Sequence, residues 1–364
     1  MKRKPFKLVV LALSSITCCL MPCGSATARD SARAKQERGD FLFFHGDVAG
    51  AIEAYEEAAQ LEPQNYELRS ALVNLYLTKK NLAAAIENCR QMVRLKPNSF
   101  EVHLLLANLL RRQGEQLEAI KEFESALNLN PNNLSIAVAL GFAQLKAGQL
   151  DKAEKNFRSG ERDRELKAES LLGLALVFQK RGDVKEALKQ VDAAIGVRES
   201  YAEAHKIRGD LLIQEKRLDE AEKELEKAMQ QNPEFLEAKL SYGNLLFERG
   251  NSAAAEAVFR QAAEIKNASE EAHYLLGIAL QRQGRLKEAA QSFENGAFID
   301  ANPDSASKMR AHARRLSSAP EGFSTPGLSG NASTLPQREL NAESIFGVSY
   351  GKLIKLQKSV TDWQ

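Results

Sequence analysis

An alanine that recurs every 34 residues is the feature that most constrains the fold of this chain. If a 34-residue unit begins at Ala32, eight units follow one another without an insertion and end at Pro303. The twentieth residue of every unit is alanine: Ala51, Ala85, Ala119, Ala153, Ala187, Ala221, Ala255 and Ala289. A period of about 20 to 50 residues indicates an array of stacked repeats, each of which buries its apolar face against its neighbours.

Three further columns of the repeat show the same period. The eighth residue is small in seven units: Gly39, Ala107, Gly141, Ala175, Gly209, Gly243 and Gly277. The twenty-fourth is apolar throughout: Tyr55, Cys89, Phe123, Phe157, Val191, Leu225, Phe259 and Phe293. Small residues at the eighth and twentieth places predict two helices in close contact. Proline follows the second helix in four units, at Pro63, Pro97, Pro131 and Pro233.

The fifteenth residue predicts the turn between the two helices. It is glycine in six units: Gly46, Gly114, Gly148, Gly182, Gly250 and Gly284. Glycine just past a helix end supplies the left-handed residue that lets the chain turn back. Lys80 and Lys216 stand at this place in the other two units.

These columns resemble the tetratricopeptide repeat, whose period is 34 residues and whose pattern includes L-G, A-x₃-F and a closing proline. The best local matches are Leu140-Gly141, Leu276-Gly277, Ala153-x₃-Phe157, Ala255-x₃-Phe259 and Ala289-x₃-Phe293. The resemblance implies an all-α fold, a right-handed α-solenoid whose first helices line a concave groove. The eight expected repeats are 32–65, 66–99, 100–133, 134–167, 168–201, 202–235, 236–269 and 270–303.

The N-terminus has the pattern of a signal peptide. MKRKPFK is positively charged, LVVLALSSITCCLM is apolar over 14 residues, and Ala26-Thr27-Ala28 fits a cleavage site. We expect residues 1–28 to be removed, and the mature chain (29–303 and beyond) to be exported, periplasmic or secreted. The alternative is a lipoprotein acylated at Cys23, although Pro22 is a poor residue before an acylated cysteine. After cleavage only Cys89 remains, so no internal disulfide is expected.

Three segments follow the repeats. DSASKMRAHARRLSS (304–318) predicts a polar capping helix, with Asp304 as its N-cap and arginines toward its C-terminus. Residues 319–338 are rich in Ser, Pro and Gly and predict a flexible linker. Residues 339–364 regain apolar side chains, which either fold back on the solenoid or form a docking peptide, for a partner or for the chain's own groove.

Composition and motifs argue against catalysis and nucleic-acid binding. The net charge is +2, and the leader supplies four cations, so the rest is slightly acidic and lacks a basic field. His103, His205 and His273 share one column, but repeats about 10 Å apart cannot bring them to one metal. The chain has no HExxH, GxSxG or P-loop motif. We therefore expect no enzyme activity, no catalytic residue, no cofactor or metal, and no small-molecule substrate.

The resemblance points to a groove that binds a protein or peptide partner. In the family, the second, fifth, sixth, ninth, twelfth and thirteenth residues of a repeat face the groove. Asn74 and Asn108 are consecutive members of the ninth column and could hold an extended peptide backbone. The candidate groove residues are Phe43, Asn74, Leu77, Asn108, Arg111, Phe142, Leu145, Leu176, Gln179, Asn244, Phe247 and Gln281.

Two functions remain open at this stage. The first is a non-enzymatic scaffold that binds a protein partner in the cell envelope or outside the cell. The second is an accessory subunit of a polysaccharide-export, secretion or pilus-assembly machine, held at a membrane only if it is lipid-anchored. A clamp for a C-terminal carboxylate is not supported, because Lys206, the only cation of the fifth column, is followed by Asp210 instead of asparagine.

Overall fold

The computed structural model describes residues 23–265, 270–300 and 302–318, and over these residues the fold is all α. The expected signal peptide up to residue 22, the linker 319–338 and the segment 339–364 lie outside the described residues. The helices are α1 (Cys23–Phe44), α2 (Val48–Leu61), α3 (Tyr66–Thr78), α4 (Leu82–Leu95), α5 (Phe100–Gln113), α6 (Gln116–Leu129), α7 (Leu134–Lys146), α8 (Leu150–Gly160), α9 (Lys167–Arg181), α10 (Val184–Val197), α11 (Ala202–Gln214), α12 (Leu218–Gln231), α13 (Leu236–Glu248), α14 (Ser252–Glu264), α15 (Glu270–Arg282), α16 (Leu286–Ile299) and α17 (Pro303–Ser317). None of these helices is both long enough and apolar enough to cross a membrane.

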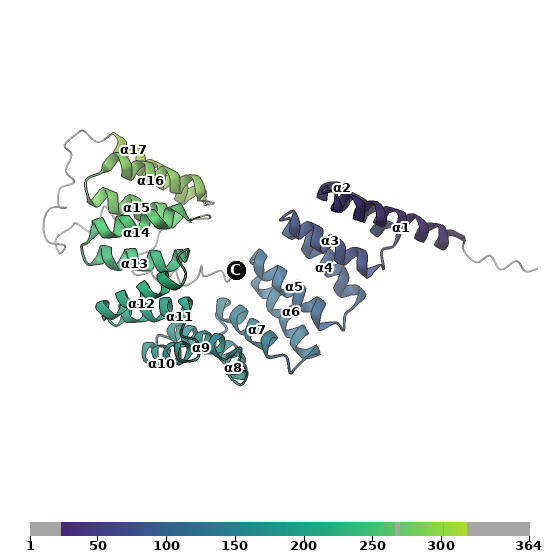
Figure 1. The fold of residues 1–364 in the computed structure, drawn as a ribbon, viewed down its shortest axis with the longest axis horizontal. Coiled ribbons are helices and arrows are strands. Elements are labelled where there is room, and N and C mark those ends of the chain that lie inside the picture. Colours follow the sequence, from purple (N-terminus) through teal and green to yellow (C-terminus); the bar gives the residue numbers. More distant parts are fainter. Residues whose placement is uncertain (1–22, 266–269, 301, 319–364) are drawn as a thin grey trace, which may run out of the picture. The chain divides into compact units, whose positions relative to one another are not determined.

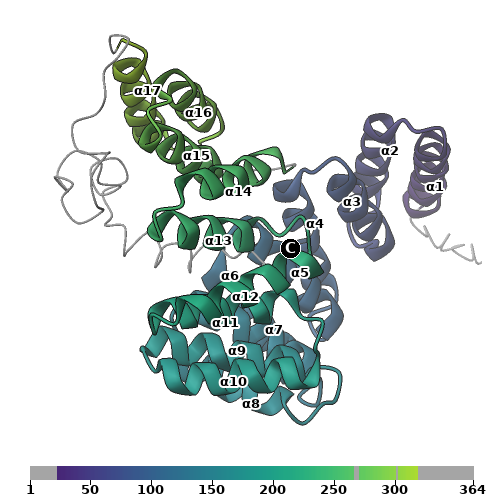
Figure 2. The same ribbon diagram turned by 60° about the vertical axis from the view of Figure 1, so that its left-hand side comes forward.

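The helices form pairs, one pair for each predicted repeat, and α17 follows the last pair (Figures 1 and 2). The chain divides into two compact units, residues 1–130 with α1–α6 and residues 131–364 with α7–α17. Within each unit, every second helix also contacts the first helix of the next repeat. This paired helix-turn-helix stacking confirms the predicted α-solenoid.

The turn between the helices of a repeat has one geometry throughout. The backbone N–H of the fifteenth residue donates to the carbonyl of the twelfth, and that of the sixteenth donates to the eleventh. In the third repeat these bonds are Gly114 N to Arg111 O, 3.2 Å, and Glu115 N to Leu110 O, 2.9 Å. This is the Schellman motif, whose C′ residue is left-handed. All six glycines have positive φ, and so do Lys80 (57°) and Lys216 (59°).

Close contact between paired helices explains the small columns. The eight alanines of the twentieth place are all 0% exposed. A Cβ added at Gly39, Gly141, Gly209, Gly243 or Gly277 would lie closer than 3.0 Å to the side chain at the twenty-fourth place of the same repeat. The eighth residue is therefore small because the large twenty-fourth side chain lies against it. Cys89 occupies that place in the second repeat, is fully buried, and has a thiol pKa raised to about 12 by burial.

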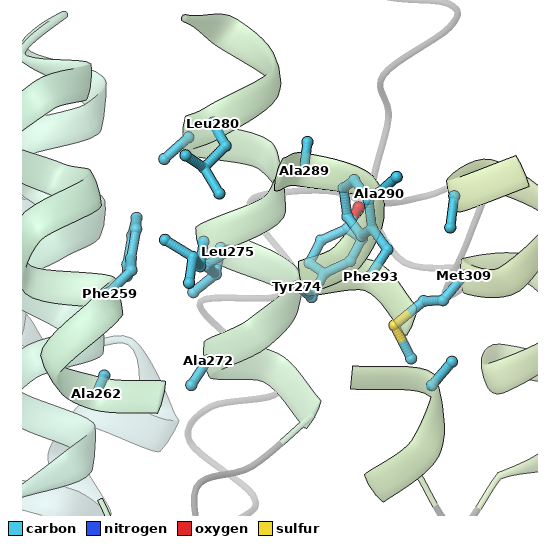
Figure 3. Close-up of a cluster of buried hydrophobic side chains, with 14 of the residues drawn as sticks. Phe259, Ala262, Ala272, Tyr274, Leu275, Leu280, Ala289, Ala290, Phe293 and Met309 are labelled. Atoms are coloured by element: carbon cyan, nitrogen blue, oxygen red, sulfur yellow. The ribbon is translucent and has the colours of Figure 1, made fainter. Parts of the chain in front are cut away.

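The last repeats show how the capping helix closes the stack. Phe259 of α14, Phe293 of α16 and Met309 of α17 belong to one buried cluster (Figure 3). Helix α17 is the expected capping helix, but the sequence predicted the wrong residue as its N-cap. Asn302, followed by Pro303 at the first helical position, accepts from the backbone of the first turn, and Asp304 lies inside the helix.

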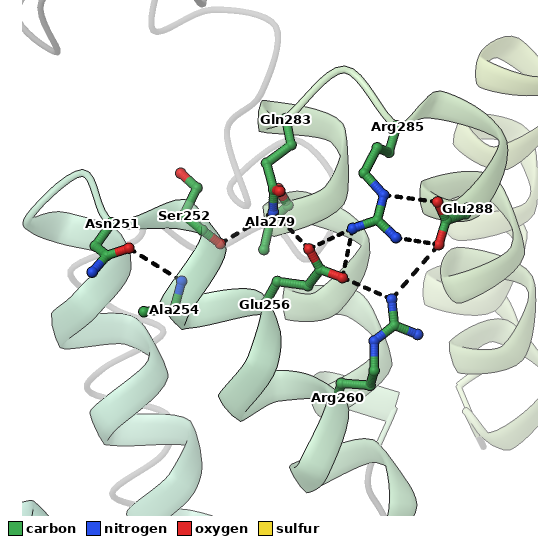
Figure 4. A network of polar contacts seen from close by, with 9 residues as sticks. All are labelled: Asn251, Ser252, Ala254, Glu256, Arg260, Ala279, Gln283, Arg285 and Glu288. Atoms are coloured by element: carbon green, nitrogen blue, oxygen red, sulfur yellow. Dashed lines mark hydrogen bonds and ion pairs between the residues drawn. The ribbon is translucent and has the colours of Figure 1, made fainter.

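Ion pairs link neighbouring repeats on the surface. Glu256 of α14 accepts hydrogen bonds from Arg285, at the start of α16, and from Arg260 of its own helix (Figure 4). Arg285 also pairs with Glu288. In the same way Arg249 pairs with Asp219 and Glu222 of the preceding repeat. Glu256 is largely buried whereas its arginine partners are partly exposed, and a fully exposed pair contributes at most about 1 kcal/mol.

Candidate protein-binding face

The first helices of successive repeats follow one another within each unit, and we call the side that they present the first-helix face. In the second unit α7 contacts α9 and α11 contacts α13, in addition to the contacts that each helix makes with its own pair. Figure 2 shows α9, α11 and α13 following one another along the stack. The predicted groove residues lie at the ninth and twelfth places of these first helices, so their exposure decides what the face can bind.

In the first unit the face carries apolar side chains, two asparagines and an arginine. Phe43 is 51% exposed, Leu77 is half-buried, and Asn74 is exposed with no side-chain hydrogen bond to another described residue. Asn108 is half-buried and donates through Nδ2 to Leu104 O of its own helix, 3.0 Å away. Asn74 is therefore free to bond a peptide backbone, whereas Asn108 offers mainly its Oδ1. Arg111 is half-buried beside them.

In the second unit four of the predicted residues are half-buried and partly accessible. Phe142 packs edge-on against Phe157, with ring centroids 4.8 Å apart. Phe247 lies under the guanidinium of Arg282, 4.5 Å from the ring centroid. Leu176 and Asn244 are half-buried as well, and Asn244 Oδ1 is buried without a hydrogen-bond partner in the described part of the chain.

The remaining three predicted residues offer little surface to a partner. Leu145, Gln179 and Gln281, at the twelfth place, are 6%, 7% and 5% exposed. Gln281 is also in contact with the capping helix, since its Oε1 lies 2.9 Å from His312 Nε2. The twelfth column is thus partly core in this unit, which the repeat pattern alone does not show.

Glutamate recurs at the second place of the repeat, near the start of the first helix, where an acidic side chain is favourable for the helix dipole. In the second unit, the first turns of α9, α11, α13 and α15 each carry one such glutamate. All four are half-buried: Glu169, Glu203, Glu237 and Glu271. Burial raises the pKa of Glu169, and burial together with the nearby Glu270 raises the pKa of Glu271 to about 7. None of the four forms an ion pair with another described residue. The second-unit face is therefore rich in partly dehydrated carboxylates, and Lys180, Lys206 and Arg282 lie on the same helices.

A buried ion pair lies on the same helices. Lys206 Nζ is 2.9 Å from Asp210 Oδ2 on α11, and both side chains are largely buried. Lys206 is close enough to Glu271 to lower the pKa of that carboxyl, although burial outweighs it. Lys206 therefore pairs with Asp210 and lies near Glu271, and it does not form a carboxylate clamp.

The histidine column has a structural explanation in two repeats. His103 Nδ1 lies 2.6 Å from Glu122 Oε2, and His205 Nδ1 lies 2.7 Å from Glu224 Oε2. In both, Nε2 faces a backbone carbonyl, Pro97 O or Glu199 O, at 3.0 Å. The described residues contain no group of three metal-ligating side chains. His103 and His205 therefore bridge the two helices of their own repeats.

Comparison with models of known protein families identifies the family of this chain. Models of the tetratricopeptide repeat match residues 42–109, 110–163 and 212–267, and residues 138–194 and 172–233, while a model of the TPR repeat matches 243–296. Together they span residues 42–296 without a gap. The chain belongs to the tetratricopeptide-repeat family.

Solved structures show the same fold. A tetratricopeptide repeat protein from Parabacteroides merdae is 19% identical over 68% of this chain and 98% of its own, with a TM-score of 0.54. Yeast Tom70 is 15% identical over 86% of this chain and 67% of its own, with a TM-score of 0.62. A chain of the APC/C hetero-tetramer Cut9-Hcn1 is 12% identical over 76% of this chain and 54% of its own, with a TM-score of 0.53. A comparison with curated protein sequences gave no match.

Proposed function

We propose that this protein is a non-enzymatic scaffold that binds a protein or peptide partner on its first-helix face. The observation that carries the proposal is the unpaired, accessible set on the first unit: Phe43, Asn74 and Leu77. Apolar side chains beside a free amide are suited to an extended peptide, because the amide bonds the backbone and the apolar groups receive alternate side chains.

The fold supports this role in a general way. Tetratricopeptide repeats are generally protein-binding, non-catalytic scaffolds, and one of the similar structures, Cut9-Hcn1, is itself a protein complex. The place of action is part of the proposal: the N-terminal signal pattern supports export, with the lipoprotein alternative open. A role as an accessory subunit of an envelope export or assembly machine is a narrower form of the same proposal.

Site-specific photocross-linking in the native cell tests the proposal. A photoreactive residue replaces Thr78 of α3 or Gln214 of α11, both exposed at the thirteenth place of a first helix. Lys121 of α6 and Lys223 of α12, exposed on second helices, are the matched controls. We expect a discrete cross-linked partner from at least one first-helix position and none from the controls. Equal cross-linking from both sets would overturn the proposed face.

A further inference from the structure

The second-unit first-helix face has an acidic character that the proposed scaffold role does not explain. Four glutamates recur along successive first helices and none is within ion-pair distance of a cation in the described chain: Glu169, Glu203, Glu237 and Glu271. Arg198 lies near Glu169 and Lys206 lies near Glu271, but burial outweighs the effect of either cation on the carboxyl pKa. Carboxylates that lose water without gaining an ion pair are destabilising, so a cationic occupant would relieve this cost.

An unpaired acceptor on one of these helices indicates what else the occupant supplies. Asn244 Oδ1 of α13 is buried and has no hydrogen-bond partner among the described residues, although the Asn244 side chain is only half-buried. Leaving such a group unpaired costs about 1–3 kcal/mol. A peptide backbone offers an N–H donor. Leu176 of α9 and Phe247 of α13 add half-buried apolar surface on the same helices.

One segment of this chain has the complementary chemistry. Residues 345–358, IFGVSYGKLIKLQK, contain Lys352, Lys355 and Lys358 and no acid. The same stretch carries Ile345, Phe346, Tyr350, Leu353 and Ile354 as apolar side chains. A basic, amphipathic peptide of this kind fits a surface that alternates glutamates with apolar patches.

The length of the chain allows this segment to reach the face. Residues 319–344 separate the last described residue, Ser318, from Ile345. A Ser- and Gly-rich chain of this length has an average span of about 28 Å and a fully extended length of about 85 Å. Neighbouring helices lie about 8–10 Å apart, so α15, α13, α11 and α9 all lie within the fully extended length of this linker from α17.

We propose that residues 345–358 dock on the first-helix face of α9, α11, α13 and α15 in the same molecule, with Lys352, Lys355 and Lys358 beside the glutamate column. The segment is thus an internal ligand that an external partner of similar basic, apolar character displaces. This inference rests on the proposed use of the first-helix face for binding. It can fail separately, because its test requires no partner.

Trp363 is the only tryptophan of the chain and lies five residues after Lys358, so it reports on this segment directly. The experiment measures the fluorescence anisotropy of Trp363 in the full chain, excited at a wavelength that spares tyrosine. The test variant is Glu203→Gln/Glu237→Gln/Glu271→Gln. The control, Glu215→Gln/Glu234→Gln/Glu264→Gln, removes the same charge from exposed sites outside the face. Circular dichroism verifies that both variants fold.

A docked segment gives Trp363 a high anisotropy that the control retains and that the test variant lowers at least about twofold, toward that of the free 343–364 peptide. An excess of that peptide, read with its Trp363 replaced by Phe, should release the native segment equally. Low anisotropy in the wild-type chain, or high anisotropy in the test variant, overturns the inference. Anisotropy that rises with protein concentration overturns it as well, because the segment would then bind a second copy.

Discussion

Replacing Lys80 and Lys216 by glycine should stabilise the protein. Both lysines are exposed and lie at positive φ, 57° and 59°, at the place where the other six repeats have glycine. A left-handed backbone costs an L-residue roughly 1–2 kcal/mol. Glycine removes this cost but loses about 0.5–1 kcal/mol through the greater freedom of the unfolded chain. The expected net gain is therefore about 0.5–1 kcal/mol for each site.

Lys79, the residue immediately before Lys80, provides the control. Lys79 has φ −81° and is equally exposed, so Lys79→Gly adds chain entropy without relieving strain. It should destabilise by about 0.5–1 kcal/mol. Two substitutions of the same kind, one residue apart, are thus predicted to have opposite signs.

Urea unfolding followed by circular dichroism measures both effects. Lys80→Gly/Lys216→Gly should raise the midpoint without changing the slope, and Lys79→Gly should lower it. If Lys80→Gly and Lys79→Gly destabilise equally, the left-handed turn is not strained and the reasoning about the fifteenth column is refuted.

Three further predictions concern other parts of the molecule. Ala187→Leu should lower the free energy of unfolding by roughly 1–3 kcal/mol, because Ala187 is 0% exposed between paired helices; an unchanged thermal melt would contradict the repeat register. Glu271 has a pKa of about 7 when folded, against 4.5 normally, so its contribution to stability falls as the pH rises from 4.5 through 7. Glu271→Gln should therefore stabilise the chain at pH 8, by on the order of 1 kcal/mol, and not at pH 4; Glu234→Gln, at an exposed turn, should show no such pH dependence. Intact mass of the native protein should show a mature chain that begins at Arg29, and an acylated Cys23 would exclude that cleavage.

The repeat period allowed the fold to be predicted, because each column has one local physical cause. Alanine at the twentieth place and glycine at the eighth follow from the close helix contact, as Ala51 and Gly243 show. Lysine does not favour a left-handed backbone, so the residue type of Lys80 and Lys216 did not predict the turn. Only their position, at the place where the other six repeats have glycine, predicted it. The N-cap of α17 was missed because Asn302-Pro303 is as good a start signal as Asp304.

The candidate face was less predictable than the fold. Exposure at the twelfth place depends on how neighbouring helices pack, so Phe43 is open while Gln281 is covered by α17. The glutamate column was visible in the sequence, but its partial burial was not. A raised pKa such as that of Glu271 depends on which groups surround the carboxyl in three dimensions.

The most direct test of the account is the affinity of a cross-linked partner for variants of the first-helix face. Asn74→Ala/Asn108→Ala removes up to two hydrogen bonds of about 0.5–1.5 kcal/mol each, so calorimetry should show binding weakened roughly five- to hundredfold. Asn295→Ala, at an exposed site of α16, should leave the affinity unchanged. Circular dichroism should show full helicity in both. Full affinity in the double variant, with helicity intact, would contradict the claim that this face binds the partner.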